Sequence, residues 1–214
     1  MGTTFKAIVK ECIDHLAKRF SDSSAFYFSE SDLQSELFSR LLQALPSETM
    51  ISNQAVWGTQ SPPSLRPCIS RAVHTELHLP EGRIDIAVLD LAKVKMYVNL
   101  RGRFGHMQLE PGHHVFIEVK ASRSNRSNFT SKTAWLKSIH SDIAKLNKHK
   151  HLCFLLCFDF SGILNKEDVR SLKAQAKRNV KVRYFIDPYE DRWFEKPTPA
   201  NHGLQRIAER SRSR

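Results

Sequence analysis

The chain has 214 residues, of which 41% are hydrophobic and 26% are charged. This balance excludes a largely disordered chain, and the length suits one domain with a substantial core rather than two full domains. Lysine and arginine number 33 against 22 acidic residues, a net charge of +11, so we expect a polyanionic partner, with nucleic acid favoured over an acidic protein or a membrane surface.

Two amphipathic helices are predicted at the start of the chain. Apolar residues at three-and-four spacing indicate a helix over residues 4–20, whose apolar face is expected to pack against the domain. A second helix is expected to begin near Ser29, whose side chain can cap the first turn together with Asp32, and to end at Pro46.

Strands are predicted to dominate the middle of the chain. Residues 46–70 are rich in Ser and Pro and indicate an irregular connection. Alternating apolar residues predict strands over residues 73–79 and 83–90, which the turn Pro80-Glu81-Gly82 joins into a hairpin. A second hairpin is expected within residues 93–110.

The second half of the chain alternates strands with helices. The apolar run over residues 115–119 predicts a short central strand, and residues 132–147 present one apolar helix face. A buried strand is predicted over residues 152–158, a helix over 168–178 and a last strand over 180–186. Helices therefore precede, interrupt and follow a group of strands, which predicts an α/β fold around one sheet.

A single domain is expected over residues 1–196, with its core at about 29–186, and a basic, flexible tail over residues 197–214. The longest purely apolar run, residues 152–158, is far too short for a membrane helix, and the N-terminus lacks a signal-peptide core. The four cysteines include no CxxC pair, which indicates neither a zinc site nor a disulfide framework. We therefore expect a cytoplasmic protein that does not associate with membranes.

Three polar residues interrupt the predicted apolar strands. Asp85 and Glu118 each lie between two aliphatic residues, where burial is costly without a compensating charge. Because strand side chains alternate, Glu118 and Lys120 share one face, and Asp85 can converge on them from a neighbouring strand. Phosphodiester hydrolysis uses this set: carboxylates hold Mg²⁺, which polarises the phosphate, and a lysine orients the attacking water or stabilises the developing charge.

The segments Gly82-Arg83-Ile84-Asp85 and Ile117-Glu118-Val119-Lys120, with a glutamate early in a preceding helix, resemble the PD-(D/E)XK nuclease superfamily. The resemblance covers roughly residues 29–160. It implies the restriction-endonuclease-like αβββαβ core, a mixed central β-sheet flanked by helices, here with an added N-terminal helix and a β-hairpin insertion.

The same resemblance implies the roles of the site residues. Asp85, Glu118 and the backbone carbonyl of Val119 would hold the metal, and Lys120 would be the catalytic lysine. Ile84 precedes Asp85 where the family usually has proline, and Glu118 follows Asp85 by 33 positions, a long gap that the hairpin insertion explains.

The family often adds a helix glutamate to its metal site. Glu30 fits this role better than Glu36, because two leucines share its helix face. An acid in the first turn also favours the helix dipole, so a purely structural role for Glu30 stays open. The segment with Asp142 and Lys145 resembles the helix that packs beside the site in family members, but neither residue is assigned a catalytic role.

Basic residues near these motifs are candidates for binding nucleic acid. They lie in the predicted insertion and in the polar segment after the central strand: Arg101, Arg103, Arg123, Arg126 and Lys132. Glu76, flanked by His74 and His78, offers an alternative transition-metal site, although a polar strand face is the commoner explanation.

Together these features predict a Mg²⁺-dependent nuclease, with Mn²⁺ as a substitute, that acts on DNA in preference to RNA and as an endonuclease in preference to an exonuclease. A homodimer would allow such an enzyme to cut both strands. The alternatives are a module of the same fold that binds nucleic acid or protein without cleavage, and a basic scaffold that binds acidic protein surfaces.

Overall fold

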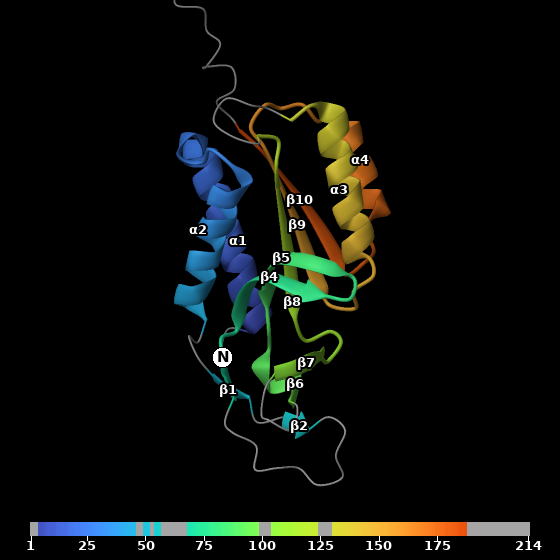
Figure 1. The fold of residues 1–214 in the computed structure, drawn as a ribbon. Helices are drawn as coiled ribbons and strands as arrows, with labels where there is room; N and C mark the ends of the chain where they lie inside the picture. Colours follow the sequence, from blue (N-terminus) through green and yellow to red (C-terminus); the bar gives the residue numbers. More distant parts are fainter. Residues whose placement is uncertain are drawn as a thin grey trace, which may run out of the picture.

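Five strands form a mixed sheet at the centre of the protein (Figure 1). The computed structural model describes residues 4–45, 49–51, 54–56, 68–98, 104–123 and 130–187. The strand order is β10-β9-β8-β5-β4; β8, β9 and β10 are parallel, whereas β8–β5 and β5–β4 are antiparallel pairs. The bounds are Val73–Leu79 for β4, Gly82–Val88 for β5, Val115–Ala121 for β8, Leu152–Asp159 for β9 and Val180–Ile186 for β10.

Helices cover both faces of this sheet (Figure 1). One face carries α1 (Phe5–Ser23) and α2 (Glu30–Ala44). The other face carries α3 (Lys132–Leu146) and α4 (Lys166–Gln175). The described residues also contain two 3₁₀ turns, η1 (Ser24–Phe26) and η2 (Leu91–Lys93). The predicted α/β fold, a mixed central sheet with helices packed on it, is thereby confirmed.

The start of α2 is fixed by the predicted cap. The Ser29 side chain accepts a hydrogen bond from the backbone N–H of Asp32 (3.4 Å), and the Asp32 carboxylate accepts one from the N–H of Ser29 (2.9 Å). This reciprocal capping box satisfies two backbone donors that a helix start otherwise leaves open. It also places Glu30 in the first turn.

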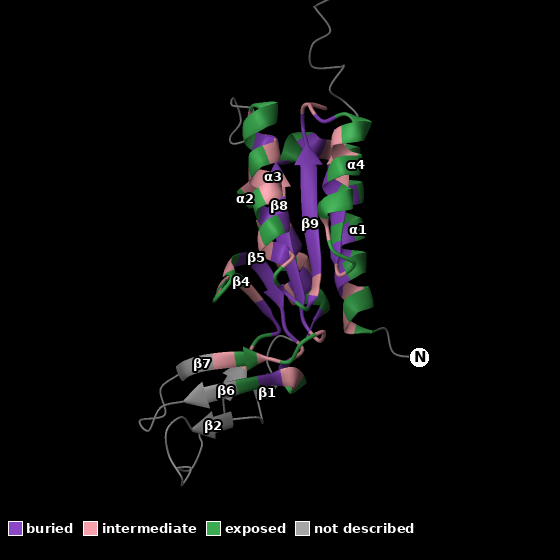
Figure 2. Ribbon diagram, turned by 90° about the vertical axis from the view of Figure 1, so that its right-hand side faces the viewer, coloured by how far each residue is buried: buried purple, intermediate pink, exposed green. Residues whose placement is uncertain are grey.

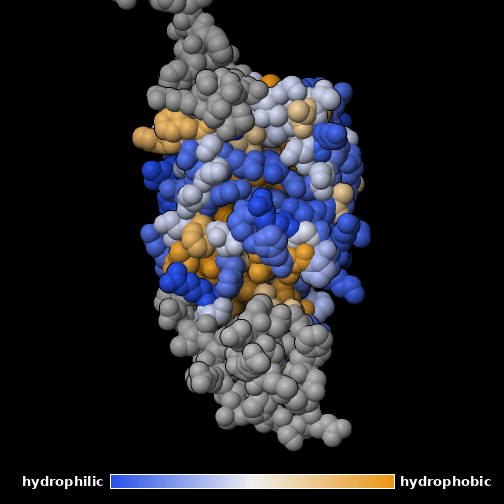
Figure 3. Space-filling view, viewed as in Figure 1, coloured by the Kyte–Doolittle hydropathy of each residue, from blue (hydrophilic) through white to orange (hydrophobic). Residues whose placement is uncertain are grey.

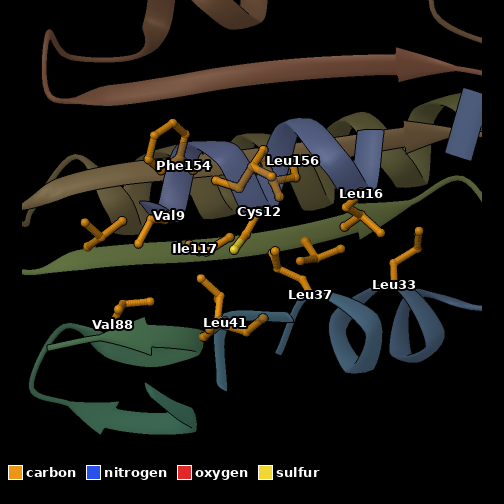
Figure 4. Close-up of a cluster of buried hydrophobic side chains, with 14 of the residues drawn as sticks. Val9, Cys12, Leu16, Leu33, Leu37, Leu41, Val88, Ile117, Phe154 and Leu156 are labelled. Atoms are coloured by element: carbon orange, nitrogen blue, oxygen red, sulfur yellow. The ribbon is translucent and has the colours of Figure 1, made fainter. Parts of the chain in front are cut away.

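One half of the core lies between α1, α2 and the sheet (Figure 4). Leu33, Leu37 and Leu41 of α2 are fully buried, at one helical turn apart, and pack in one cluster with Ile117 of β8 and Leu156 of β9. Complete burial of such an aliphatic side chain contributes about 1.5–3 kcal/mol. The three-and-four spacing in the sequence therefore corresponds to the packed faces of both helices.

The other half of the core lies between the sheet and the second helix pair. Trp135, Ile139 and Ile143 of α3 pack with Phe116 of β8 and Leu155 of β9. Trp135 is only 1% exposed, so it is a core residue. Figure 2 shows β8 and β9 buried along nearly their whole length, because helices cover both of their faces.

Alternation along β8 decides which side the polar residues face. Val115, Ile117 and Val119 belong to the core on the side of α1 and α2, and Phe116 belongs to the core on the side of α3 and α4. Glu118 and Lys120 follow Phe116 at two-residue steps and therefore face α3.

The prediction of an irregular connection over residues 46–70 was wrong in part. Three short strands occur there: β1 (Thr49–Ile51), β2 (Gln54–Val56) and β3 (Cys68–Ser70). β1 pairs with β3, while β2 joins the predicted hairpin β6 (Val94–Val98) and β7 (Phe104–Leu109) in a second sheet. Strands of three residues are too short to show a period-two pattern in the sequence.

The start of α4 also differs from its prediction by two residues. The helix begins at Lys166 because Asn165 and Asp168 form a capping box there. No helix among the described ranges is long and apolar enough to cross a membrane.

Candidate functional site

The sheet splits at the point where the two predicted acids lie. Backbone pairing between β5 and β8 ends at Ile86 and Ile117, so Asp85 and Glu118 would form the next pair. Their side chains replace the missing backbone partners. The N–H of Asp85 donates to Oε1 of Glu118 (3.3 Å), and the N–H of Val119 donates to Oδ2 of Asp85 (2.9 Å). Two carboxylates thus meet where the strands separate.

Glu30 binds the same open edge of β8 one step further along. Its Oε2 accepts a hydrogen bond from the N–H of Ala121 (3.2 Å). Alternate residues of a strand direct their N–H groups to the same edge. Asp85, which accepts from Val119, and Glu30, which accepts from Ala121, therefore bind neighbouring donors on one edge of β8. The carbonyl of Val119 shares this edge, because the N–H and C=O of one strand residue point the same way.

Two lysines pair with three of the four acids. Lys120 Nζ lies 3.3 Å from Oε1 of Glu30 and 3.3 Å from Oδ2 of Asp142. Lys145 Nζ lies 2.8 Å from Oε1 of Glu118 and 3.3 Å from Oδ1 of Asp142. We call these residues the acid–lysine cluster: Glu30, Asp85, Glu118, Lys120, Asp142 and Lys145. It contains four carboxylates against two ammonium groups, so a further cation would be attracted to it.

Burial changes the protonation of this cluster. Glu118 is 1% exposed, and burial together with the nearby charge of Asp85 raises its pKa to about 8. Burial also raises the pKa of Glu30, against the opposing effect of Lys120. For Lys120, burial alone would lower the pKa, but Glu30 and Asp142 outweigh it and raise the pKa. Lys120 therefore stays charged, whereas Glu118 needs another positive charge to be fully ionised at neutral pH.

The donor set suits a hard divalent cation only in part. Carboxylate oxygens are the ligands that Mg²⁺ prefers, and one or two of them, completed by water and substrate phosphates, are the usual protein contribution. Within the described residues, no three His, Cys, Asp or Glu side chains are arranged to hold a metal together. The acids are instead paired with lysines, because Lys145 lies on a carboxylate oxygen of Glu118 and Lys120 lies on one of Glu30. Asp85 and Glu118 offer two carboxylates of the kind that Mg²⁺ prefers, and Lys145 lies on one oxygen of Glu118.

The structure brings four predicted site residues together: Glu30, Asp85, Glu118 and Lys120. Glu36, the rejected alternative to Glu30, instead pairs with Arg40 of the same helix (2.5 Å). Glu30 therefore lies beside Lys120 and the edge of β8, whereas Glu36 lies apart from them. Hydrophilic side chains gather across the middle of the face that Figure 1 presents, between the two helix pairs and above the β4–β5 hairpin (Figure 3).

The predicted nucleic-acid contacts are only partly within the described residues. The Arg123 guanidinium lies over the ring of Phe160, 5.4 Å from its centroid. Lys132 pairs with Asp168 (2.7 Å) and so joins α3 to α4. The remaining predictions lie outside the described ranges: Arg101, Arg103, Arg126 and the tail over residues 197–214.

The alternative metal site around Glu76 is not formed in the structure. Its carboxylate pairs with Arg83 (2.6 Å), and His74 instead contacts the Arg71 carbonyl (2.8 Å). These contacts favour the structural explanation of this strand face.

Asp142 and Lys145 are the two cluster members to which the sequence assigned no role. A signal for Asp142 was available, because it occupies a position on the apolar face of α3 defined by Ile139, Ile143 and Leu146. An acid at a core-facing position needs a buried partner, and Asp142 is 8% exposed. Lys145 follows one turn later, where a helix lysine reaches the same partner.

Comparison of the chain with protein-family models, with curated proteins and with solved structures finds no match. Relatives therefore show neither a family nor an activity. The cluster combines two carboxylates at a split in the sheet, Asp85 and Glu118, with one lysine that pairs with Glu118 and a second that pairs with Glu30.

Proposed function

We propose that the chain is a Mg²⁺-dependent nuclease of the PD-(D/E)XK type, with a restriction-endonuclease-like core, that hydrolyses phosphodiester bonds of DNA. The observation that carries the proposal is the meeting of Asp85 and Glu118, two buried carboxylates with lysines beside them. The order helix glutamate, hairpin aspartate, then Glu-x-Lys on a central strand supports it.

Asp85 and Glu118 would hold the cation, with the Val119 carbonyl on the same strand edge. When bound, the cation supplies positive charge that polarises the phosphate and lowers the pKa of a water molecule. Lys120 would orient the attacking water or stabilise charge on the phosphate oxygens, since its ammonium group is kept protonated by two carboxylates. Glu30 positions Lys120 and holds the open edge of β8 through Ala121.

The charge of the whole chain supports a polyanionic substrate. A net charge of +11 attracts nucleic acid from a distance, whereas the cluster itself has more carboxylates than ammonium groups. A phosphate would therefore approach the acids only together with a cation. A positive net charge that attracts the substrate, combined with an acidic centre that attracts a metal ion, suits metal-dependent phosphodiester hydrolysis.

The test is cleavage of plasmid and labelled DNA and RNA oligonucleotides with Mg²⁺ or Mn²⁺. Asp85→Asn keeps an oxygen for the Val119 N–H but removes the charge, so cleavage should fall at least about 100-fold, since metal-supplied charge contributes several kcal/mol and each 1.4 kcal/mol is tenfold. Glu36→Gln, in the same helix as Glu30 but outside the cluster, should retain activity. Equal activity of Asp85→Asn and the unaltered protein would exclude this mechanism.

A second candidate is a module of the same fold that binds nucleic acid or protein without cleavage. The observation that favours it is structural: Asp85 and Glu118 already accept hydrogen bonds from backbone donors at the split, and Lys145 already pairs with Glu118. DNA binding that weakens with salt, without cleavage under Mg²⁺ or Mn²⁺, would support this function.

A further inference from the structure

Lys145 has the contacts of a cation built into the site. Its Nζ lies 2.8 Å from Oε1 of Glu118 and 3.3 Å from Oδ1 of Asp142, and it donates a hydrogen bond to the carbonyl of Arg83 (2.8 Å). An ammonium group has three donors, and these three acceptors account for all of them. The side chain is only 21% exposed, so the pairing with Glu118 is largely shielded from water.

The β4–β5 hairpin is shaped to admit this lysine. A Cβ atom at Gly82 would lie 3.1 Å from Cδ of Lys145, closer than side chains normally approach. Gly82 also has a φ of +133°, which favours glycine. The segment Gly82-Arg83-Ile84-Asp85 therefore does more than present Asp85: its glycine makes room for the lysine, and its arginine carbonyl binds the ammonium group.

The position of Lys145 conflicts with a divalent cation. A cation held by Asp85 and Glu118 would lie beside an ammonium group that already occupies Glu118, and the like charges would repel each other. Lys120 has no such conflict at this oxygen, because its partners are Glu30 and Asp142. Asp142 lies one turn before Lys145 in α3, so a displaced Lys145 would keep one carboxylate partner.

We propose that Lys145 is an internal counter-ion that competes with a divalent cation for Glu118, so that cation binding displaces its ammonium group. The inference rests on the proposed function, since it takes Asp85 and Glu118 as the cation ligands. In the absence of the cation, the Lys145 ammonium group pairs with Glu118 and Asp142. In the presence of the cation, the Lys145 ammonium group leaves Glu118 and stays beside Asp142 of α3.

The first test measures cation affinity without nucleic acid. Mn²⁺ is titrated into the full chain, and free Mn²⁺ is followed by electron paramagnetic resonance. Lys145→Met should bind Mn²⁺ at least about tenfold more tightly than the unaltered protein, because no buried ion pair has to be broken. Lys137→Met is the matched control: it makes the same change at an exposed position of α3 and should leave the affinity unchanged.

The outcomes separate this inference from the proposed function. Mn²⁺ binding that is equal or weaker in Lys145→Met would overturn the competition but leave the metal site in place. Absence of Mn²⁺ binding in every form of the protein would overturn the metal site and the competition together. Tighter binding in Lys145→Met that is lost in Asp85→Asn would support both.

A second test uses the unaltered protein and does not depend on how a variant folds. Acetic anhydride modifies free amines, and mass spectrometry reports the modification of each lysine. Saturating Mn²⁺ should increase the modification rate of Lys145 several-fold, while Lys137 provides the reference. An unchanged or decreased rate at Lys145 would show that the cation does not displace it.

Discussion

The two ends of β8 bury ionisable side chains in opposite ways. Near its carboxyl end lies the acid–lysine cluster, in which every lysine lies within 3.3 Å of two carboxylates. At its amino end the ring of His114 packs against that of His151, with centroids 5.0 Å apart, and the ring of His149 lies 6.5 Å from that of His151; all three are buried. We call these three residues the histidine cluster. One strand therefore carries a buried site made of charges and a buried site made of neutral rings.

The histidine cluster has few polar partners, one of which is the Glu81 carboxylate, 3.9 Å from Nδ1 of His149. The rings of His149 and His151 pack edge-on against Phe116, at centroid distances of 4.9 and 4.7 Å. Nδ1 of His114 accepts a hydrogen bond from the N–H of Asp90 (3.1 Å). Among the described residues, one ring nitrogen of each histidine has no hydrogen-bond partner: Nε2 of His114, Nε2 of His149 and Nδ1 of His151.

Burial determines the charge state of these rings. It lowers the pKa of His114 to about 4, and burial with the neighbouring histidines lowers that of His151 to about 4. Burial lowers the pKa of His149 as well, against the opposing effect of Glu81. The comparison teaches that a buried ionisable group is tolerated either when opposite charges hold it ionised or when it stays neutral. Only the first arrangement contains internal cations, the ammonium groups of Lys120 and Lys145.

The largest effect is expected from removing the charge of Lys120. Lys120→Met leaves Glu30 and Asp142 without their shared cation, and breaking a buried ion pair costs about 3–5 kcal/mol. Urea unfolding at pH 7 would measure the loss in the free energy of unfolding. The control is Lys137→Met, at an exposed position of α3, where the free energy of unfolding should fall by no more than about 0.5 kcal/mol. Equal losses in the two variants would mean that the cluster is not held by charge.

A smaller effect, with a distinct pH dependence, is expected from the histidine cluster. The folded-state pKa of His151 is about 4, below the unfolded value of about 6.5, so the unfolded chain takes up the proton first. Its contribution to stability is present above pH 6.5 and is lost as the pH falls toward 4. In His151→Phe, which keeps an aromatic ring, the acid-induced loss should shrink by on the order of 3 kcal/mol.

Unfolding of His151→Phe and the unaltered protein at a series of pH values would measure this difference. At pH 7 the variant should be as stable as the unaltered protein, because the histidine there is neutral and one of its nitrogens has no described partner. Parallel curves from pH 7 to pH 4 would show that His151 does not titrate as its burial implies.

The sequence predicted the fold where local physics decides it. The cap at Ser29 and the spacing of Leu33, Leu37 and Leu41 depend only on neighbouring residues, and the structure shows both. The short strands β1, β2 and β3 were missed because they depend on partners distant in the chain. A three-residue strand has no periodicity of its own to detect.

The candidate site was likewise predictable where neighbouring residues decide it and was missed where distant partners do. Asp85 and Glu118 were found because aliphatic neighbours on each side mark them as buried strand residues. The place of Lys145 depends on which turn of α3 lies beside the β4–β5 hairpin, and this is decided by tertiary packing. The histidine cluster was missed as a unit because His114 meets His151 only when β8 and β9 pair.

The smallest effect is expected from the exposed ion pair beside the acid–lysine cluster. Glu76 and Arg83 lie 2.6 Å apart, closer than any ion pair within the cluster, but their side chains are 44% and 59% exposed. Water screens such a pair, and the side chains lose conformational entropy to form it, so its contribution is about 0–1 kcal/mol. Glu76→Gln should therefore reduce the free energy of unfolding by no more than about 0.5 kcal/mol, an effect that added salt should diminish.

Measured in the same urea series as Lys120→Met, this variant separates distance from burial as the source of ion-pair strength. A loss for Glu76→Gln as large as that for Lys120→Met would mean that separation alone sets the strength of these pairs. A much smaller loss, in spite of the shorter distance, would show that exclusion of water makes the cluster at β8 strong. The same exclusion of water makes the ammonium group of Lys120 costly to remove unless another cation replaces it.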